Sequence, residues 1–164
     1  MVIRQAGATA YVGIGANLGV ARSTVAAAIA WLARLQGCRL LAASSVWRSA
    51  PVDAHGPDFF NAVVTIETSL SPEALLAELQ AIEQAFGRQR PYHHAPRTLD
   101  LDLLLHGDAV RSTPQLTLPH PRLHQRAFVL RPLLEIAPDL AAPGLGPLVD
   151  WLPATAGQAV ERLD

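Results

Sequence analysis

A chain of 164 residues is long enough for one ordinary domain. Half of its residues are apolar, and they are spread along the sequence without a membrane-spanning stretch. The formal net charge of −1 argues against the broad basic surface of a nucleic-acid-binding protein. All 13 basic residues are arginine, which excludes a Schiff-base or P-loop lysine but leaves phosphate binding open. Because the N-terminus lacks a secretory signal, we expect a soluble cytoplasmic protein. We also expect a monomer with one domain over residues 1–164, without nucleic-acid or membrane partners.

The first elements alternate between strand and helix. Small and apolar residues predict a buried strand over residues 9–16. Apolar residues recur at helical spacing from 22 to 36, and Gly37 ends this helix. Residues 39–49 carry β-branched and aromatic side chains without a helical period, so they predict a second strand.

A loop, a third strand and a second helix follow. Residues 51–57 form the loop, and alternating apolar and polar residues predict the strand over 60–68. Ser71 is a good N-cap and Pro72 suits the first helical position, so we expect a helix from there to Gly87, which can end it. An apolar stripe along this segment indicates that one face of the helix packs on the sheet.

A fourth strand completes the pattern. A second loop covers residues 89–96, and residues 98–106 predict the strand. The order β-α-β-β-α-β predicts an α+β fold, a ferredoxin-like sandwich with an antiparallel sheet and helices on one face. We expect the Pro-rich remainder from Asp108, with its shorter helical pieces, to pack on the same domain as a C-terminal elaboration.

The fourth strand carries the strongest chemical signal, Asp100 and Asp102. Residues two apart on a strand point to the same face, so these carboxylates project together while the leucines between them face the core. At a Cα separation of roughly 6.5 Å they repel by about 2.5 kcal/mol, a cost that a divalent cation with oxygen ligands removes. Ordinary solvated acids on an exposed strand face explain these two residues, taken alone, equally well.

Three arginines bracket the acidic pair. Arg88 and Arg90 follow the second helix, and Arg97 precedes the acidic strand. Guanidinium groups around a metal–carboxylate pair suit polyphosphate transfer, because they neutralise charge on the phosphates. Arg88 alone is better explained as a partner of the helix dipole, but the three together favour phosphate binding.

Aromatic, amide and imidazole groups indicate a second ligand. Phe59 and Asn61 place an aromatic face beside an amide, which suits a flat heterocycle with donors and acceptors on its edge. His120 lies between two prolines that fix its backbone, and Phe128 follows it. Taken singly, the two phenylalanines are better explained as core residues and His120 as an exposed loop residue. The pair His93-His94 lacks a third metal ligand.

Together these segments resemble the 6-hydroxymethyl-7,8-dihydropterin pyrophosphokinase family. The most specific part of the resemblance is the run PRTLDLDL over residues 96–103. The other matching segments, in family order, are residues 11–19, 58–62, 82–83, 87–90, 118–122, 126, 128–130 and 135–138.

The resemblance implies an ATP-dependent diphosphotransferase that moves the β,γ-pyrophosphoryl group of ATP to the pterin hydroxymethyl oxygen and releases AMP. It implies that Asp100 and Asp102 ligate two Mg²⁺ ions, and that Arg88 and Arg97 stabilise the transferring group. The pterin-binding residues that it implies are Ser49, Val52, Phe59, Asn61 and Phe128. The nucleotide-binding residues that it implies are Glu83, Arg90, Leu103, His120 and Arg126.

The chain departs from the family pattern in three places. Ala16 stands where the family usually has Ser, and Ala50 stands where Pro is common. The residues His93-His94-Ala95 replace the Arg-Trp-Gly that often precedes the Pro-Arg-Thr run. This change falls in the loop over residues 88–96, which the resemblance implies closes over the site, and it leaves the acidic pair untouched.

Two other functions use similar features. The order β-α-β-β-α-β is also that of RNA-recognition modules, but those need exposed aromatic residues on a central strand and a basic surface. A metal-dependent phosphohydrolase would use the same carboxylates with water as the acceptor, and pterin-dependent ATP consumption separates it from the transferase.

Overall fold

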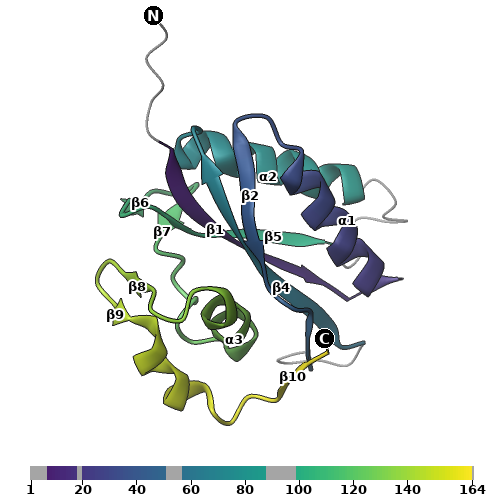
Figure 1. The fold of residues 1–164 in the computed structure, drawn as a ribbon, viewed down its shortest axis with the longest axis vertical. Helices are drawn as coiled ribbons and strands as arrows, with labels where there is room; N and C mark the ends of the chain where they lie inside the picture. Colours follow the sequence, from purple (N-terminus) through teal and green to yellow (C-terminus); the bar gives the residue numbers. More distant parts are fainter. Residues whose placement is uncertain (1–6, 18–19, 51–56, 88–98, 164) are drawn as a thin grey trace, which may run out of the picture.

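The computed structural model describes residues 7–17, 20–50, 57–87 and 99–163. The strands of its main sheet are β1 (Ala8–Ala16), β2 (Cys38–Ala43), β3 (Trp47–Ser49), β4 (Phe59–Thr68), β5 (Asp100–His106) and β10 (Val160–Arg162). They lie in the order β10-β3-β4-β1-β5, and β2 also pairs with β4 (Figure 1). Every pair in this sheet is antiparallel, so the predicted ferredoxin-like arrangement is confirmed.

Two helices cover one face of the sheet. The helices α1 (Ala21–Ala33) and α2 (Pro72–Gly87) lie side by side against it (Figure 1). Buried residues of both helices pack with those of β1, β4 and β5 in the larger hydrophobic core. The predicted start of the second helix is also confirmed, because the hydroxyl of Ser71 accepts a hydrogen bond from the backbone N–H of Ala74 at 3.1 Å.

The prediction of one strand over residues 39–49 is wrong in one respect, because the structure has two strands there, β2 and β3. The hydroxyl of Ser44 accepts a hydrogen bond from the backbone N–H of Val63 at 2.9 Å and so takes the place of a ladder carbonyl. The backbone N–H and hydroxyl of Ser45 both donate to the carboxylate of Glu135, each at 2.9 Å. Side-chain hydrogen bonds therefore interrupt the backbone ladder over residues 44–46.

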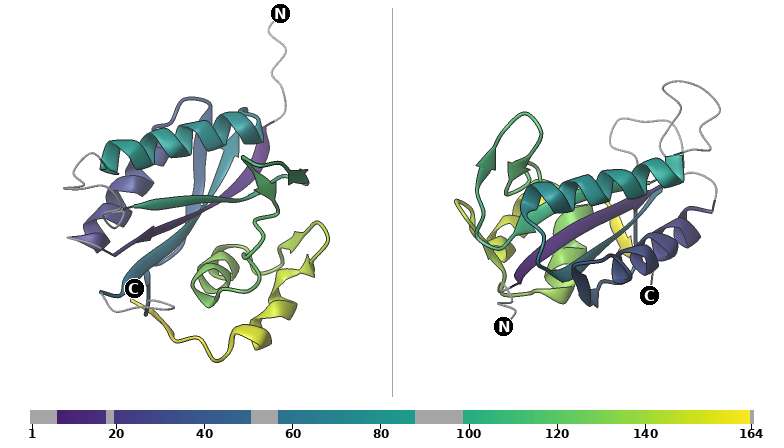
Figure 2. Two further views of the ribbon diagram at one scale, coloured as in Figure 1. Left: turned by 180° about the vertical axis from the view of Figure 1, so that it is seen from behind. Right: turned by 90° about the horizontal axis from the view of Figure 1, so that it is seen from above.

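The expectation that the two helices of the β-α-β-β-α-β order lie on one face is confirmed by α1 and α2, and the C-terminal elaboration covers the other face. A third helix, α3 (Ala127–Ile136), packs on the opposite face against Val63, Leu104 and Leu105 in a second core. The C-terminal part also contains β6 (Arg111–Ser112), β7 (Thr117–Leu118), β8 (Ala141–Ala142), β9 (Gly146–Pro147) and the 3-10 helix η1 (Leu148–Thr155). From η1 the chain passes beneath α3 and returns to the sheet as β10 (Figure 2).

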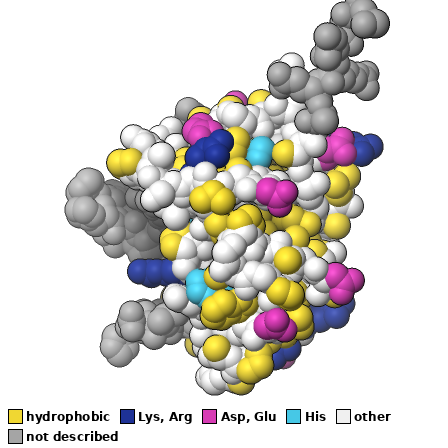
Figure 3. Space-filling model, turned by 90° about the vertical axis from the view of Figure 1, so that its left-hand side faces the viewer, with side chains coloured by type: hydrophobic (Ala, Val, Ile, Leu, Met, Phe, Trp, Pro, Cys, Tyr) yellow, Lys and Arg dark blue, Asp and Glu magenta, His cyan; other side chains and the backbone are white. Residues whose placement is uncertain are grey.

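The surface and helix lengths add two observations. Figure 3 shows acidic and basic side chains scattered in small separate groups over one face, between apolar ones. None of the helices in the described ranges is both long enough and apolar enough to cross a bilayer.

Candidate active site

A pocket of about 340 Å³ opens between the sheet and the first turn of α3. Its volume is in the range of small-molecule sites. The side chains that give it chemical character are Ser49, Phe59, Asn61, Asp100, Asp102, Arg126 and Phe128. The pocket therefore collects residues from β3, β4, β5 and α3, which are far apart in the sequence.

Two glycines of β1 form the floor of this pocket. Gly15 pairs with Asn61 of β4 on one side and with Asp100 of β5 on the other, and Gly13 pairs with Asp102. Residues paired across a sheet share a face, so the missing side chains leave open space between the amide and the two carboxylates. A Cβ atom added at Gly15 would lie 3.3 Å from the Oδ1 atom of Asn61. Sequence reasoning did not identify this floor, because it depends on the register of three strands.

The two carboxylates lie on the pocket side of β5 as predicted. Asp100 and Asp102 are half-buried, while Leu101 and Leu103 between and beyond them are buried in the core with α1 and α2. Among the described residues, no group of three His, Cys, Asp or Glu side chains could hold a metal ion. Two carboxylates completed by water and phosphate oxygens are the coordination that Mg²⁺ favours, so the donor set fits this ion.

A hydrogen bond holds the amide of the pocket. The Nδ2 atom of Asn61 donates to the Oγ atom of Ser49 at 2.8 Å, and both residues are buried. The bond joins neighbouring strands β3 and β4, so the amide has one orientation toward the pocket.

An aromatic pair stands on the rim of the pocket. Phe59 begins β4 and Phe128 lies in the first turn of α3, and both are only half-buried. The guanidinium carbon of Arg126 lies 5.5 Å from the centre of the Phe128 ring. Arg126, which the resemblance assigned to the nucleotide, therefore lines the same pocket as the residues assigned to the pterin.

A second pocket of about 250 Å³ adjoins the first. Asp102 lines both pockets. The other residues around the second pocket come from α2, from β5, from the β6–β7 hairpin and from the segment after it, and they include Leu76, Leu103 and His120. The side chain of Leu103 is itself packed in the core.

His120 faces this second pocket with a defined hydrogen-bonding pattern. Burial lowers the pKa of His120, the carboxylate of Asp102 opposes this shift, and Arg126 and Arg122 lower the pKa further. The neutral imidazole accepts a hydrogen bond at Nδ1 from the backbone N–H of Arg122 at 3.2 Å. Its Nε2–H is therefore the side that can donate to a ligand.

Glu83 supports the acidic strand from helix α2. Its Oε2 atom accepts a hydrogen bond from the backbone N–H of Leu101 at 2.8 Å. Leu101 lies between the two aspartates, so this bond fixes the backbone at the centre of the acidic pair.

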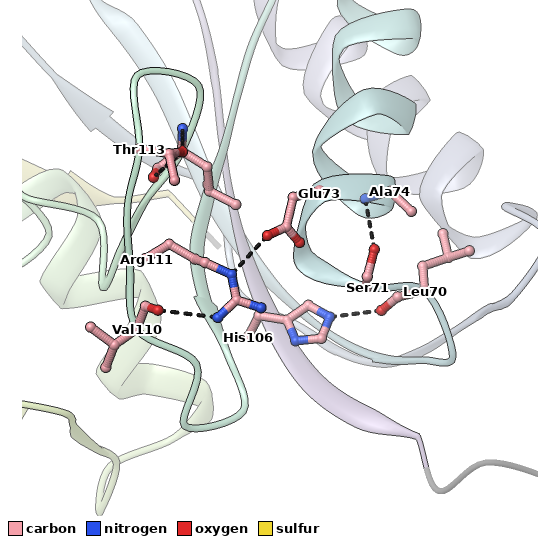
Figure 4. Close-up of polar contacts among 9 residues, drawn as sticks. Leu70, Ser71, Glu73, Ala74, His106, Val110, Arg111 and Thr113 are labelled. Atoms are coloured by element: carbon pink, nitrogen blue, oxygen red, sulfur yellow. Dashed lines mark hydrogen bonds and ion pairs between the residues drawn. The ribbon is translucent and has the colours of Figure 1, made fainter.

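The β6–β7 hairpin that walls the second pocket is tied to the start of α2. The Nε atom of Arg111 lies 2.7 Å from Oε1 of Glu73 (Figure 4). Beside it, Nε2 of His106 lies 2.9 Å from the backbone oxygen of Leu70. Sequence reasoning missed Arg111, because its partner is 38 residues away and no local pattern connects them.

Four of the predicted site residues lie outside the described residues. These are Val52, Arg88, Arg90 and Arg97, and the pair His93-His94 lies there too. The bracket of arginines around the acidic pair stays a prediction.

Comparison with known sequences gives concordant matches. A model of the family described as 7,8-dihydro-6-hydroxymethylpterin-pyrophosphokinase (HPPK) matches residues 11–138. A 2-amino-4-hydroxy-6-hydroxymethyldihydropteridine pyrophosphokinase from Synechocystis is 46% identical over 94% of this chain and 76% of that protein. A protein of the same name from Pseudomonas aeruginosa is 43% identical over 93% of this chain and 95% of that protein.

Comparison with solved structures supports the fold. An HPPK-DHPS structure in complex with substrates superimposes with a TM-score of 0.72 at 12% identity, over 92% of this chain. The Plasmodium falciparum HPPK-DHPS with pteroate gives a TM-score of 0.71 at 11% identity. This chain spans 43% of each of those chains, so it is similar to less than half of their length.

Proposed function

Because the chain belongs to the 7,8-dihydro-6-hydroxymethylpterin-pyrophosphokinase family, we propose that it transfers the pyrophosphoryl group of ATP to the hydroxymethyl oxygen of 6-hydroxymethyl-7,8-dihydropterin. AMP is the second product, and the reaction is a step of folate biosynthesis. The observation that carries the proposal is the position of Asp102, which lines both pockets. This position supports a reaction in which a phosphate chain bound in one pocket meets an acceptor hydroxyl bound in the other.

The larger pocket takes the pterin in this proposal. The rings of Phe59 and Phe128 flank a flat heterocycle, and the amide of Asn61 binds its polar edge. Ser49 holds that amide through their hydrogen bond. Val52, which the resemblance also assigns to the pterin, lies outside the described residues.

The second pocket takes the nucleotide. His120 offers an Nε2–H donor there, and Leu103 borders the pocket. Glu83 acts on this side through the backbone of β5. Arg126 reaches the nucleotide from the rim of the larger pocket. Arg88, Arg90 and Arg97, outside the described residues, bind the phosphates as the sequence pattern predicts.

Mg²⁺ fits the two carboxylates. Asp100 and Asp102 supply negatively charged oxygen ligands on one strand face, and two ions are proposed because one pair of carboxylates can serve both. When bound, Mg²⁺ neutralises charge on the phosphates and orients them.

The protein contributes mainly positioning and charge. The pterin hydroxyl oxygen attacks the β-phosphorus in line with the bond to the α–β bridging oxygen, which breaks as AMP leaves. Asp102 assists loss of the hydroxyl proton at the junction of the pockets. The neutral His120 donates a hydrogen bond from Nε2 to the nucleotide and takes no part in the proton transfer.

The wider setting is also a proposal. We place the enzyme in the cytoplasm as a monomer, and we treat residues 1–164 as one domain because both hydrophobic cores share a single sheet. Small molecules are its only proposed partners, and the mixed charges in Figure 3 give no reason to add nucleic acid.

A phosphohydrolase with the same carboxylates is the competing function. Purified protein is incubated with MgATP, with and without 6-hydroxymethyl-7,8-dihydropterin, and AMP and ADP are separated by chromatography. We expect AMP only when the pterin is present. ADP, or hydrolysis that does not depend on the pterin, would replace the transferase with the phosphohydrolase.

A further inference from the structure

Gln158 holds the backbone on both sides of Arg126. Its Oε1 atom accepts a hydrogen bond from the backbone N–H of Ala127, and its Nε2 atom donates to the backbone oxygen of Gln125, both at 2.8 Å. Gln158 lies after η1, 31 residues beyond Ala127 in the sequence. One side-chain amide therefore holds the two consecutive peptide groups on either side of Arg126.

The contact supplies a helix cap that α3 lacks locally. Arg126 is the N-cap residue of α3, and its side chain makes no capping hydrogen bond. The N–H of Ala127 is one of the first backbone donors of the helix and has no acceptor within it. Gln158 provides that acceptor from outside the helix, so the start of α3 depends on it.

The backbone held in this way carries two pocket residues. Arg126 and Phe128 are the residues on either side of Ala127. The guanidinium carbon of Arg126 lies 5.5 Å from the centre of the Phe128 ring. Both side chains line the larger pocket. A shift of the chain at Gln125 or Ala127 would move both of them relative to the sheet.

The segment that carries Gln158 is itself tied to the opposite wall of the pocket. The backbone N–H of Gln158 donates to the oxygen of Thr155 at 2.9 Å. Two residues later Val160 begins β10 and pairs with Ser49 of β3, which lines the same pocket. The C-terminal segment thus connects β3, which contains Ser49, with the start of α3, which contains Phe128, and Figure 2 shows this segment running from beside α3 to the sheet.

We propose that Gln158 is a positioning residue for the pterin site, which sets the place of Arg126 and Phe128 relative to the sheet. The inference rests on the proposed function for its kinetic consequence, but the contact itself can be tested without catalysis.

The kinetic test compares Gln158→Met with Gln36→Met. Methionine keeps the length of the side chain and removes both hydrogen bonds, and Gln36 is an exposed residue after α1 that lines neither pocket. We expect the pterin KM of Gln158→Met to rise roughly tenfold with kcat changed less than about twofold, as the loss of ground-state binding requires. A role in stability alone would lower Tm and the amount of active enzyme while leaving KM unchanged, and that result would overturn the proposal.

A second variant tests the route of the effect. If Gln158 acts through Phe128, adding Gln158→Met to Phe128→Ala changes the pterin KM little beyond the single Phe128→Ala substitution. An effect of Gln158→Met that is equally large in both backgrounds would contradict this route.

The contact is also tested by amide hydrogen exchange in the full-length protein. We expect the Ala127 amide to exchange about tenfold faster or more in Gln158→Met than in wild type, and at the wild-type rate in Gln36→Met. Unchanged exchange at Ala127 would overturn the proposal. Wild-type protein that makes no AMP from ATP and the pterin would overturn the proposed function instead, and the exchange result would still decide the role of Gln158.

Discussion

The Oε1 atom of Glu135 accepts a hydrogen bond from the indole nitrogen of Trp47 at 2.9 Å, which joins helix α3 to strand β3. The other oxygen of the carboxylate accepts the two hydrogen bonds from Ser45, and the guanidinium of Arg162 lies 3.6 Å from it. One carboxylate therefore connects the helix, the interruption between β2 and β3, and the last strand. Of these elements, α3 lines the larger pocket, and β10 pairs with Ser49, which lines it from β3.

We predict that Glu135→Gln lowers the free energy of unfolding by about 2 kcal/mol at neutral pH, because hydrogen bonds to a charged acceptor are replaced by weaker ones. Partial burial raises the pKa of Glu135, but hydrogen bonds from Ser45 and Trp47 and the charge of Arg162 outweigh it, so the folded-state pKa is lowered from 4.5. The stabilisation is therefore complete above about pH 4.5 and is lost as pH falls through the lower folded-state pKa.

Urea unfolding of wild type and Glu135→Gln between pH 3 and pH 7 measures this dependence. The matched control is Glu78→Gln, since Glu78 is exposed on α2. A difference between wild type and Glu135→Gln that stays constant down to pH 3 would show that the charge of Glu135 contributes nothing.

For the acidic pair we predict opposite effects on activity and stability. Asp102→Ala should reduce pterin-dependent AMP formation by more than about a thousandfold, because it removes a ligand at the junction of the two pockets. The Tm without Mg²⁺ should be unchanged or slightly higher, since the substitution removes the repulsion with Asp100. Asp108→Ala, in the exposed turn after β5, is the control. Near-normal activity of Asp102→Ala would eliminate the metal assignment.

Much of this architecture follows from local sequence patterns. The alternation over β5 and the apolar stripe of α2 were predicted to within two residues, because each element has a buried and an exposed face. The same alternation placed Asp100 and Asp102 on one face without knowledge of the neighbouring strands.

The rest of the site depends on contacts between distant segments. The role of Gly13 and Gly15 as a floor requires the register of β1 against β4 and β5, which local patterns do not determine. The side of the sheet covered by α3 was not predicted either, because its apolar face fits either face of a sheet. Gln158 carries no signal at all, since a polar residue in a turn is ordinary until its partners are known.

The pair formed by Arg111 and Glu73 should affect nucleotide binding weakly. Arg111→Gln removes the ion pair between the β6–β7 hairpin and α2, so we predict that the KM for ATP rises about two- to threefold at low ionic strength. The effect should disappear at high salt, because Glu73 is exposed and Arg111 is only half-buried, so solvent ions screen their attraction. The control is Arg39→Gln, which breaks a second exposed pair, with Glu67, far from both pockets. A rise in the pterin KM alone would contradict the placement of the hairpin beside the nucleotide.

At the floor of the larger pocket, we predict different effects of substituting Gly13 and Gly15, two residues apart on β1. A Cβ atom at Gly15 would lie 3.3 Å from the Oδ1 atom of Asn61, a contact that the hydrogen bond between Asn61 and Ser49 prevents from relaxing freely. At Gly13 the added atom would meet the flexible end of Leu104 at 3.6 Å, an ordinary contact. We therefore predict that Gly15→Ala raises the pterin KM about tenfold and leaves the KM for ATP unchanged, while Gly13→Ala has a clearly smaller effect. Steady-state kinetics with each substrate varied in turn decides the question, and equal effects of the two substitutions would show that Asn61 is free to move.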